Sequence, residues 1–141
     1  PVNDSNTSAQ KGTKGLAKMP AVKSLDNTFG AYPAFAWSDV KNGPAGTTVY
    51  ASGMTGVWYL PARDELLSVY NAWNGYGRGS FDGIITTAGG TGFTPDYYWA
   101  SSEAAYSGNF LLSSYINFFD GIATWTNGRV IACRVRAVMA F

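Results

Sequence analysis

Histidine is absent from this chain of 141 residues, and cysteine occurs once, at Cys133. The lack of histidine removes the commonest general base and metal ligand, and with it any Ser-His-Asp or Cys-His catalytic arrangement. We therefore expect no metal site. One cysteine cannot form a disulfide within the chain, so packing alone has to hold the fold together. We expect Cys133 to be a small buried hydrophobic residue rather than a reactive thiol.

Charge is also scarce, because charged residues make up 13% of the chain and the net charge is +1. This gives no electrostatic support for binding to nucleic acid or to an anionic membrane surface. No apolar run is long enough to span a bilayer, so we expect no membrane insertion. The glycine-rich tract at 89–92 lacks the Gly-Lys-Ser/Thr sequence of a phosphate-binding loop. We expect no nucleotide and no other cofactor.

The length corresponds to one domain. Residues 1–14 are polar and are expected to form a disordered arm or linker, which leaves 15–141 as the folded domain. A weak apolar alternation at 15–27 predicts a short strand. Residues 31–41 predict a first helix, which the following Asn-Gly-Pro sequence ends. Residues 43–56 are rich in glycine and threonine and predict a loop.

A second helix is predicted to start near Pro61, because proline lacks only an N–H group that would be unpaired there. Asp64 and Glu65 lie early in this helix, where its dipole favours carboxylates. Its expected buried stripe consists of Leu66, Leu67, Val69, Tyr70 and Trp73. Residues 75–96 predict a long glycine-rich connection, with a short strand at 84–85. The chain closes on a Val- and Ala-rich run that predicts a last strand.

The composition of residues 104–127 is unusual. The segment contains no Lys, Glu, Gln or Met and consists mainly of Ala, Ser, Tyr, Asn, Phe, Leu, Ile, Gly and Thr. A solvent-facing strand pair normally includes Lys and Glu, which discourage edge-to-edge association. Tyr, Ser, Gly and Asn are instead the residues that binding loops use for contact area and adaptable hydrogen bonding. This composition favours a recognition surface.

Several short motifs occur in a recognisable order. They are W-x-L-P-x-x-D-E-L from Trp58, Y-W-A-S-S-E from Tyr98, F-x-x-G from Phe118 and V-R-A-V-M-A-F from Val135 to the end. This combination resembles C-type-lectin-fold domains, including the variable proteins that diversity-generating retroelements target in bacteria, archaea and phages. The resemblance covers roughly residues 31–141. Each motif is short, but their order and the ending make the combination fairly specific.

The resemblance implies an α+β fold of the C-type lectin type. Two helices would pack on a small twisted antiparallel sheet with much irregular loop. Ala100 and Met139 depart from the usual pattern, and neither threatens the fold. The cysteine pairs and the Glu-Pro-Asn motif of animal C-type lectins are missing, so calcium-dependent sugar binding is not implied. The expected structural residues are Trp58, Leu60, Pro61, Leu66, Trp99, Phe118 and Val135.

The same resemblance offers a cause for the composition of 104–127. In such systems a template is copied with random changes at adenines, and Asn codons then yield residues that include Tyr, Asp, Ser, Gly, Phe, Leu, Ile, Thr and Ala. Every residue of the segment except Trp125 belongs to the set that these codons reach. The expected variable, ligand-contacting residues are Tyr106, Asn109, Leu111, Tyr115, Asn117, Phe119, Asp120, Ile122, Thr124, Trp125 and Asn127.

Strand alternation predicts which of these side chains face a partner. Phe118 matches a core position, so Ser114 and Ile116 should share its inward face, while Tyr115, Asn117 and Phe119 point outward. On the next strand either the face of Ile122, Thr124 and Thr126 or the face of Ala123 and Trp125 joins the surface. We expect Trp125 to be exposed and to complete an aromatic cluster with Tyr115 and Phe119.

These observations favour a ligand-binding, receptor-recognition protein and not an enzyme. The expected partner is a protein on another cell or virus surface, and display at a cell surface, outside the cell or on a virion is expected. An exposed apolar patch could instead serve self-association. Two further functions stay open: an invariant adhesin or fibre-tip domain on the same fold, and a hydrolase that uses Glu65 and Glu103. We expect Glu65 to cap its helix and Glu103 to take a structural hydrogen bond or to pair with Arg136.

Overall fold

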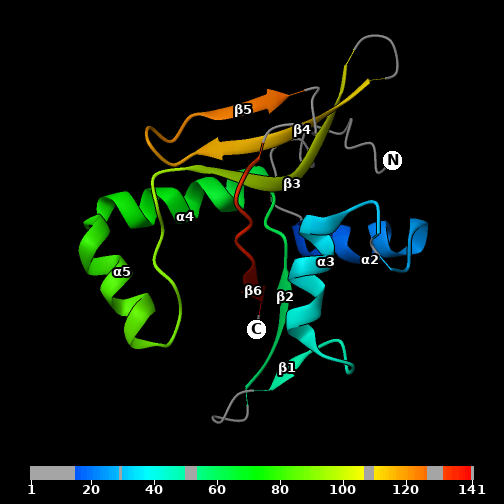
Figure 1. The fold of residues 1–141 in the computed structure, drawn as a ribbon, viewed down its shortest axis with the longest axis horizontal. Coiled ribbons are helices and arrows are strands. Elements are labelled where there is room, and N and C mark those ends of the chain that lie inside the picture. Colours follow the sequence, from blue (N-terminus) through cyan, green and yellow to red (C-terminus); the bar gives the residue numbers. More distant parts are fainter. Residues whose placement is uncertain (1–14, 29, 50–53, 107–109, 127–131, 141) are drawn as a thin grey trace.

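The computed structural model describes residues 15–28, 30–49, 54–106, 110–126 and 132–140. The chain has a mixed α+β fold in which helices flank two antiparallel sheets (Figure 1). One sheet has the strand order β1-β2-β6 and the other β3-β4-β5. The helices are α2 (Gly15–Leu25), α3 (Pro33–Asp39), α4 (Arg63–Gly75) and α5 (Arg78–Thr87), with the short 3-10 helix η1 (Val40–Asn42). The strands are β1 (Thr48–Val49), β2 (Thr55–Tyr59), β3 (Tyr97–Tyr106), β4 (Phe110–Asn117), β5 (Ala123–Thr126) and β6 (Val138–Ala140).

Two predicted strands are wrong, because both segments are helical. Most of the segment 15–27 forms α2 (Gly15–Leu25), whose buried positions Gly15, Met19 and Val22 recur at the three- to four-residue spacing of a helix face. The pair at 84–85 lies inside α5, where Ile85 packs against the core and Ile84 is exposed. The prediction of two helices is therefore too low, since the described residues contain four α-helices.

The helix predicted near Pro61 is confirmed, although Pro61 precedes its first turn. Helix α4 begins at Arg63, after the N-cap Ala62. The Glu65 carboxylate accepts a hydrogen bond of 2.8 Å from the Ala62 N–H, so the expected capping role of Glu65 is confirmed. The Arg63 N–H donates to the buried Ser102 hydroxyl at 3.0 Å, which ties the start of α4 to β3.

The main core consists of aromatic rings from α4, from the loop before β3 and from the sheet β3-β4-β5. Phe118 is fully buried at its centre, and its ring centroid lies 4.4 Å from that of Tyr98, 5.2 Å from Phe93 and 5.3 Å from Tyr70. Trp73 closes the cluster with its ring centroid 5.6 Å from that of Phe118. The predicted burial of Leu60, Pro61, Leu66 and Phe118 is confirmed.

Three residues predicted to fill the core lie elsewhere. Trp58 and Trp99 are half-buried and belong to neither buried cluster. Val135 is also half-buried and packs against a smaller cluster that contains Met19, Val22 and Leu60. Tyr98 joins the predicted Trp73 in the main core, because β3 presents Tyr98, and not the neighbouring Trp99, toward Phe118.

The sheet β3-β4-β5 has an inner and an outer face. Directly paired residues of antiparallel strands share a face. Tyr98 pairs with Ile116 and Ile116 with Ala123 on the inner face, where Ile116 is fully buried. Ser114 is also buried, so the predicted inward orientation of Ser114 and Ile116 is confirmed. Residues at the intervening positions form the outer face.

The C-terminal run crosses from one sheet to the other. The backbone of Arg134 bridges β3, donating to the Tyr97 carbonyl at 2.7 Å and accepting from the Trp99 N–H at 2.9 Å. The chain then pairs with β2 as β6, so the predicted last strand is confirmed only over Val138–Ala140. Among the described residues, no helix combines the length and apolar character needed to cross a membrane.

Candidate binding surface

An aromatic cluster lies on the outer face of the sheet β3-β4-β5. Trp99 and Tyr115 are directly paired across β3 and β4, with ring centroids 6.2 Å apart and ring planes at 89°. Tyr97 meets Tyr115 from the other side at 5.4 Å and 85°. All three side chains are partly exposed. Sequence analysis missed Tyr97, although its two-residue spacing from Trp99 would have placed it on the same face.

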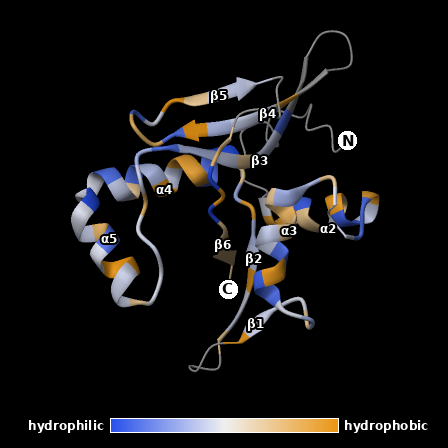
Figure 2. Ribbon diagram, in the orientation of Figure 1, coloured by the Kyte–Doolittle hydropathy of each residue, from blue (hydrophilic) through white to orange (hydrophobic). Residues whose placement is uncertain are grey.

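The turn between β4 and β5 includes hydrophobic residues, coloured orange in Figure 2. Phe119 is 60% exposed and Ile122 is 58% exposed. Two predicted contact residues hold the turn together. The Asn117 amide donates to the Asp120 carboxylate at 3.0 Å and accepts from the Phe119 N–H at 3.0 Å. Asp120 also accepts from the Ile122 N–H at 2.9 Å, so these polar side chains present their apolar neighbours to solvent.

Trp125 does not join this cluster. It is directly paired with Ser114, whose side chain faces inward, whereas Thr124 is paired with Tyr115 and lies on the outer face. Trp125 is half-buried, and the guanidinium carbon of Arg63 lies 5.2 Å from its ring centroid. The predicted aromatic cluster of Trp125, Tyr115 and Phe119 is therefore wrong. The register between β4 and β5, which a sequence does not reveal, decides between the two faces of β5.

The side chains of four predicted contact residues lie outside the described part of the structure. Tyr106 and Leu111 belong to the ladder between β3 and β4, paired with Phe110 and Ala105, but their side chains lie outside the described part of the structure. Asn109 and Asn127 lie outside the described residues altogether. Contact of these four residues with a ligand stays a prediction.

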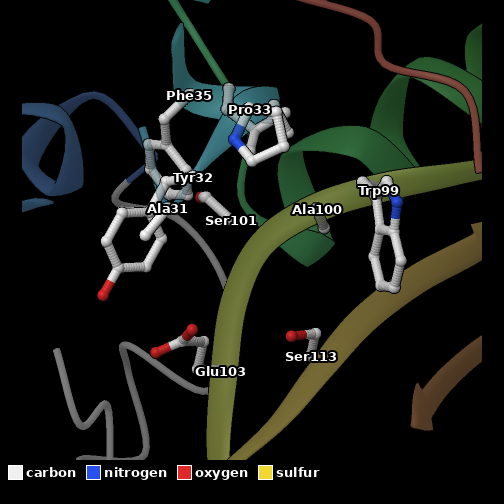
Figure 3. Close-up of a pocket in the computed structure, with 11 residues that line it drawn as sticks. Ala31, Tyr32, Pro33, Phe35, Trp99, Ala100, Ser101, Glu103 and Ser113 are labelled. Carbon is white, nitrogen blue, oxygen red and sulfur yellow. The ribbon is translucent and has the colours of Figure 1, made fainter. Parts of the chain in front are cut away.

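A small pocket opens between α3 and the outer face (Figure 3). Its volume is about 150 Å³. We call it the Glu103 pocket; its lining includes Tyr32, Phe35, Leu60, Trp99, Ser101 and Glu103. The sequence motifs gave Ser101 no separate role and Glu103 a structural hydrogen bond or a pairing with Arg136, and they did not predict that α3 would face these two residues. The pairing of two segments so far apart in the sequence depends on tertiary structure.

A larger hollow of about 920 Å³ also borders α3. It is lined by residues that include Trp37, Lys41, Trp58 and Arg136. The Lys41 ammonium lies 4.1 Å from the Trp37 ring centroid, a cation–π distance. The guanidinium of Arg136 donates to the carbonyls of Thr91 at 2.8 Å and Gly92 at 2.9 Å.

The two carboxylates considered for a hydrolase lie in different surroundings. Glu65 is engaged in capping α4, and Glu103 lies on β3 at the pocket. The residues that the structure describes contain no group of three or more acidic or cysteine side chains placed to hold a metal ion. The arrangement offers apolar contact area, hydrogen-bonding groups and one pocket carboxylate.

The Cys133 thiol is expected to react slowly. Burial raises its pKa from 9.0 to about 11, and the Asp96 carboxylate contributes to the rise. Such a rise lowers the thiolate fraction near neutral pH about a hundredfold. We expect alkylation by iodoacetamide to be about a hundredfold slower in the folded chain than in urea, with a rate that rises until about pH 11.

The unfolded chain is the control for this measurement, and equal alkylation rates in both states would contradict the raised pKa of Cys133.

The same pKa shift determines how the free energy of unfolding depends on pH. Because the folded-state pKa is raised, the thiol favours folding below its ordinary pKa of 9.0. That contribution is lost as the pH rises toward 11.

A comparison with models of protein families, with curated proteins and with solved structures finds no match to this chain. The residues and their arrangement are therefore the basis for a proposed function.

Proposed function

We propose that the chain is a C-type-lectin-fold recognition protein whose outer face binds a variable partner protein. The observation that supports this most directly is the exposed aromatic cluster of Tyr97, Trp99 and Tyr115, continued by Phe119 and Ile122 at the turn. Tyrosine and tryptophan supply large contact area with few rotatable bonds, and they dominate the energetics of protein interfaces.

The backbone beneath this surface is held independently of the outer side chains. Strand β4 is paired on both sides, with β3 and with β5. The inner face packs against the aromatic core around Phe118. A partner would therefore meet a surface that is already ordered, and little conformational entropy would be lost on binding. The same construction tolerates substitution on the outer face, because exposed side chains contribute little to stability.

Retroelement diversification of residues 104–127 is part of the proposal, supported by the composition of the segment. Its test is genomic. A near-copy of the coding sequence for the C-terminal region, differing from it only at adenines and lying beside a reverse-transcriptase gene, is the expected result. If the locus has neither feature, an invariant adhesin with the same binding face becomes the better explanation.

The binding role is tested with the double variant Tyr115→Ala and Phe119→Ala. Surface proteins of neighbouring microbial cells and phages are captured on the native chain, identified, and then titrated against each variant. We expect the double variant to bind at least about a hundredfold more weakly, because two aromatic contacts of about 2 kcal/mol each are lost. Its free energy of unfolding should change by less than about 2 kcal/mol, since both side chains are partly exposed.

Tyr76→Ala is the matched control, because Tyr76 is a 72% exposed tyrosine that follows α4 and does not belong to the sheet β3-β4-β5. Binding should survive this change. A partner that binds the double variant as tightly as the native chain would place the recognition surface elsewhere.

A further inference from the structure

The Glu103 pocket adjoins the outer face but is built differently. Trp99 belongs to both, and Ser113, which also lines the pocket, is directly paired with Glu103 across β3 and β4. The opposite wall comes from the segment around α3 and includes Tyr32 and Phe35. A cavity of about 150 Å³ accommodates a group of roughly the size of benzene. The pocket is therefore sized for one side chain of a partner and not for a whole ligand.

The pocket contains a buried hydroxyl that lacks a partner. Ser101 is 4% exposed, and its Oγ makes no hydrogen bond to any described residue. The Lys18 ammonium approaches the same residue but donates to the backbone carbonyl of Ser101 at 3.1 Å, not to the hydroxyl. A buried polar group without a partner costs about 1–3 kcal/mol. A ligand that offers a hydrogen-bond donor to Ser101 Oγ would recover part of this cost.

Glu103 contributes a carboxylate to the same pocket. Figure 3 shows the side chains of Ser101 and Glu103 projecting from β3 on the side of Tyr32. Glu103 is half-buried and is the charged residue among the described residues that line the pocket. It has further interactions within the protein. An ionised carboxylate has about four acceptor positions, however, so it can accept an additional donor while keeping its charge.

We infer that the Glu103 pocket takes the ammonium end of a lysine side chain from the partner bound at the outer face. The aliphatic stem would pack against Phe35 and Trp99, and the ammonium would donate to the Glu103 carboxylate and to Ser101 Oγ. A compact ammonium with three rotatable donors suits acceptors that lie in different directions better than a planar guanidinium does.

This inference rests on the proposed function for the source of the lysine, but the chemistry of the pocket does not depend on it. Both acceptors and the Trp99 ring belong to the Y-W-A-S-S-E motif and precede the unusual segment 104–127. The pocket would thus supply a constant anchor beside a face whose side chains vary. A partner would need one lysine in a fixed position, and the variable residues would decide between partners that have it.

The test uses two small probes and the full chain. N-acetyl-lysine methylamide is titrated against the protein and followed by the NMR signals of the Ser101 and Glu103 amides and the Trp99 indole. N-acetyl-norleucine methylamide has a similar aliphatic stem without the ammonium and is the matched probe. The expected result is saturable shifts at these three groups for the lysine probe and at least about tenfold weaker binding of the norleucine probe. Equal binding of the two probes, or no shift at the three groups, overturns the inference.

Substitutions in the Glu103 pocket test which side chains bind the lysine probe. Glu103→Gln preserves the shape of the side chain and removes its charge, and it should weaken binding of the lysine probe about tenfold or more. Ser101→Ala should weaken it severalfold. Asp39→Asn is the control, because it removes one carboxylate charge outside the pocket. Asp39 of α3 forms a surface ion pair with Lys23 of α2. An NMR spectrum with native dispersion shows that each variant is folded. A Glu103→Gln variant that binds the lysine probe normally overturns the inference.

The probe titration needs no partner, so the two proposals fail separately. Absence of probe binding refutes the lysine pocket and leaves binding at Tyr115 and Phe119 standing. Probe binding by a chain whose double variant still captures its partner supports the pocket and refutes the proposed binding face.

Discussion

Replacing Phe118 with alanine is expected to lower the free energy of unfolding by about 4 kcal/mol, because the ring is fully buried among four other aromatic side chains. The loss has two parts: the transfer free energy of the ring, and the contacts that its neighbours cannot recover around the cavity. A domain of this size has a total stability of about 5–15 kcal/mol. Urea denaturation followed by tryptophan fluorescence measures the change.

Phe119→Ala is the matched control, because Phe119 is the next residue along the chain and is 60% exposed. Its effect should stay within about 0.5 kcal/mol. Comparable destabilisation by the two substitutions would mean that the core does not centre on Phe118. Trp58→Ala and Trp99→Ala are expected to cost less than Phe118→Ala, because both tryptophans are half-buried.

Gly121→Ala is expected to lower the free energy of unfolding by about 3 kcal/mol. Gly121 has φ of 78°, a conformation that costs an L-residue about 1 kcal/mol. A Cβ there would also meet the Tyr70 ring, with Cδ1 at 2.8 Å. Tyr70 is buried against Phe118 and has little room to move, so overpacking adds about 2 kcal/mol.

Gly43→Ala separates the cost of the positive φ from the cost of the clash with the Tyr70 ring. Gly43 has φ of 63°, but nothing lies within 4 Å of the position that its Cβ would take. This variant should therefore show only the backbone cost of about 1 kcal/mol. The difference between the two variants in urea denaturation measures the clash with Tyr70. Equal effects would show that the ring moves aside freely.

Gly121 also connects the core to the proposed binding surface. Its N–H donates to the Asn117 carbonyl at 2.7 Å within the turn that exposes Phe119 and Ile122. The close approach of Tyr70 therefore fixes the position of that turn from below. In the F-x-x-G motif, the phenylalanine fills the core and the glycine lets the turn lie against it.

Sequence reasoning succeeded where a local signal was sufficient. The α+β class, the helix after Pro61, the cap formed by Glu65 and the inward alternation of Ser114 and Ile116 all follow from spacing along one element. It failed where two competing local patterns had similar strength. Residues 15–27 carry apolar residues at a spacing that suits a strand or a helix, and burial against Leu60 favoured the helix.

For this protein, the sequence alone determined the lack of any histidine-based chemistry, the two main helices and a C-terminal segment with the composition of a recognition surface. Only the tertiary structure decided that Tyr97, and not Trp125, joins Tyr115 on the outer face, and that α3 closes a pocket over Ser101 and Glu103. The physical reason is that strand register and the packing of distant segments depend on the contacts of the whole fold, whereas periodicity reports only the preferences of one element at a time.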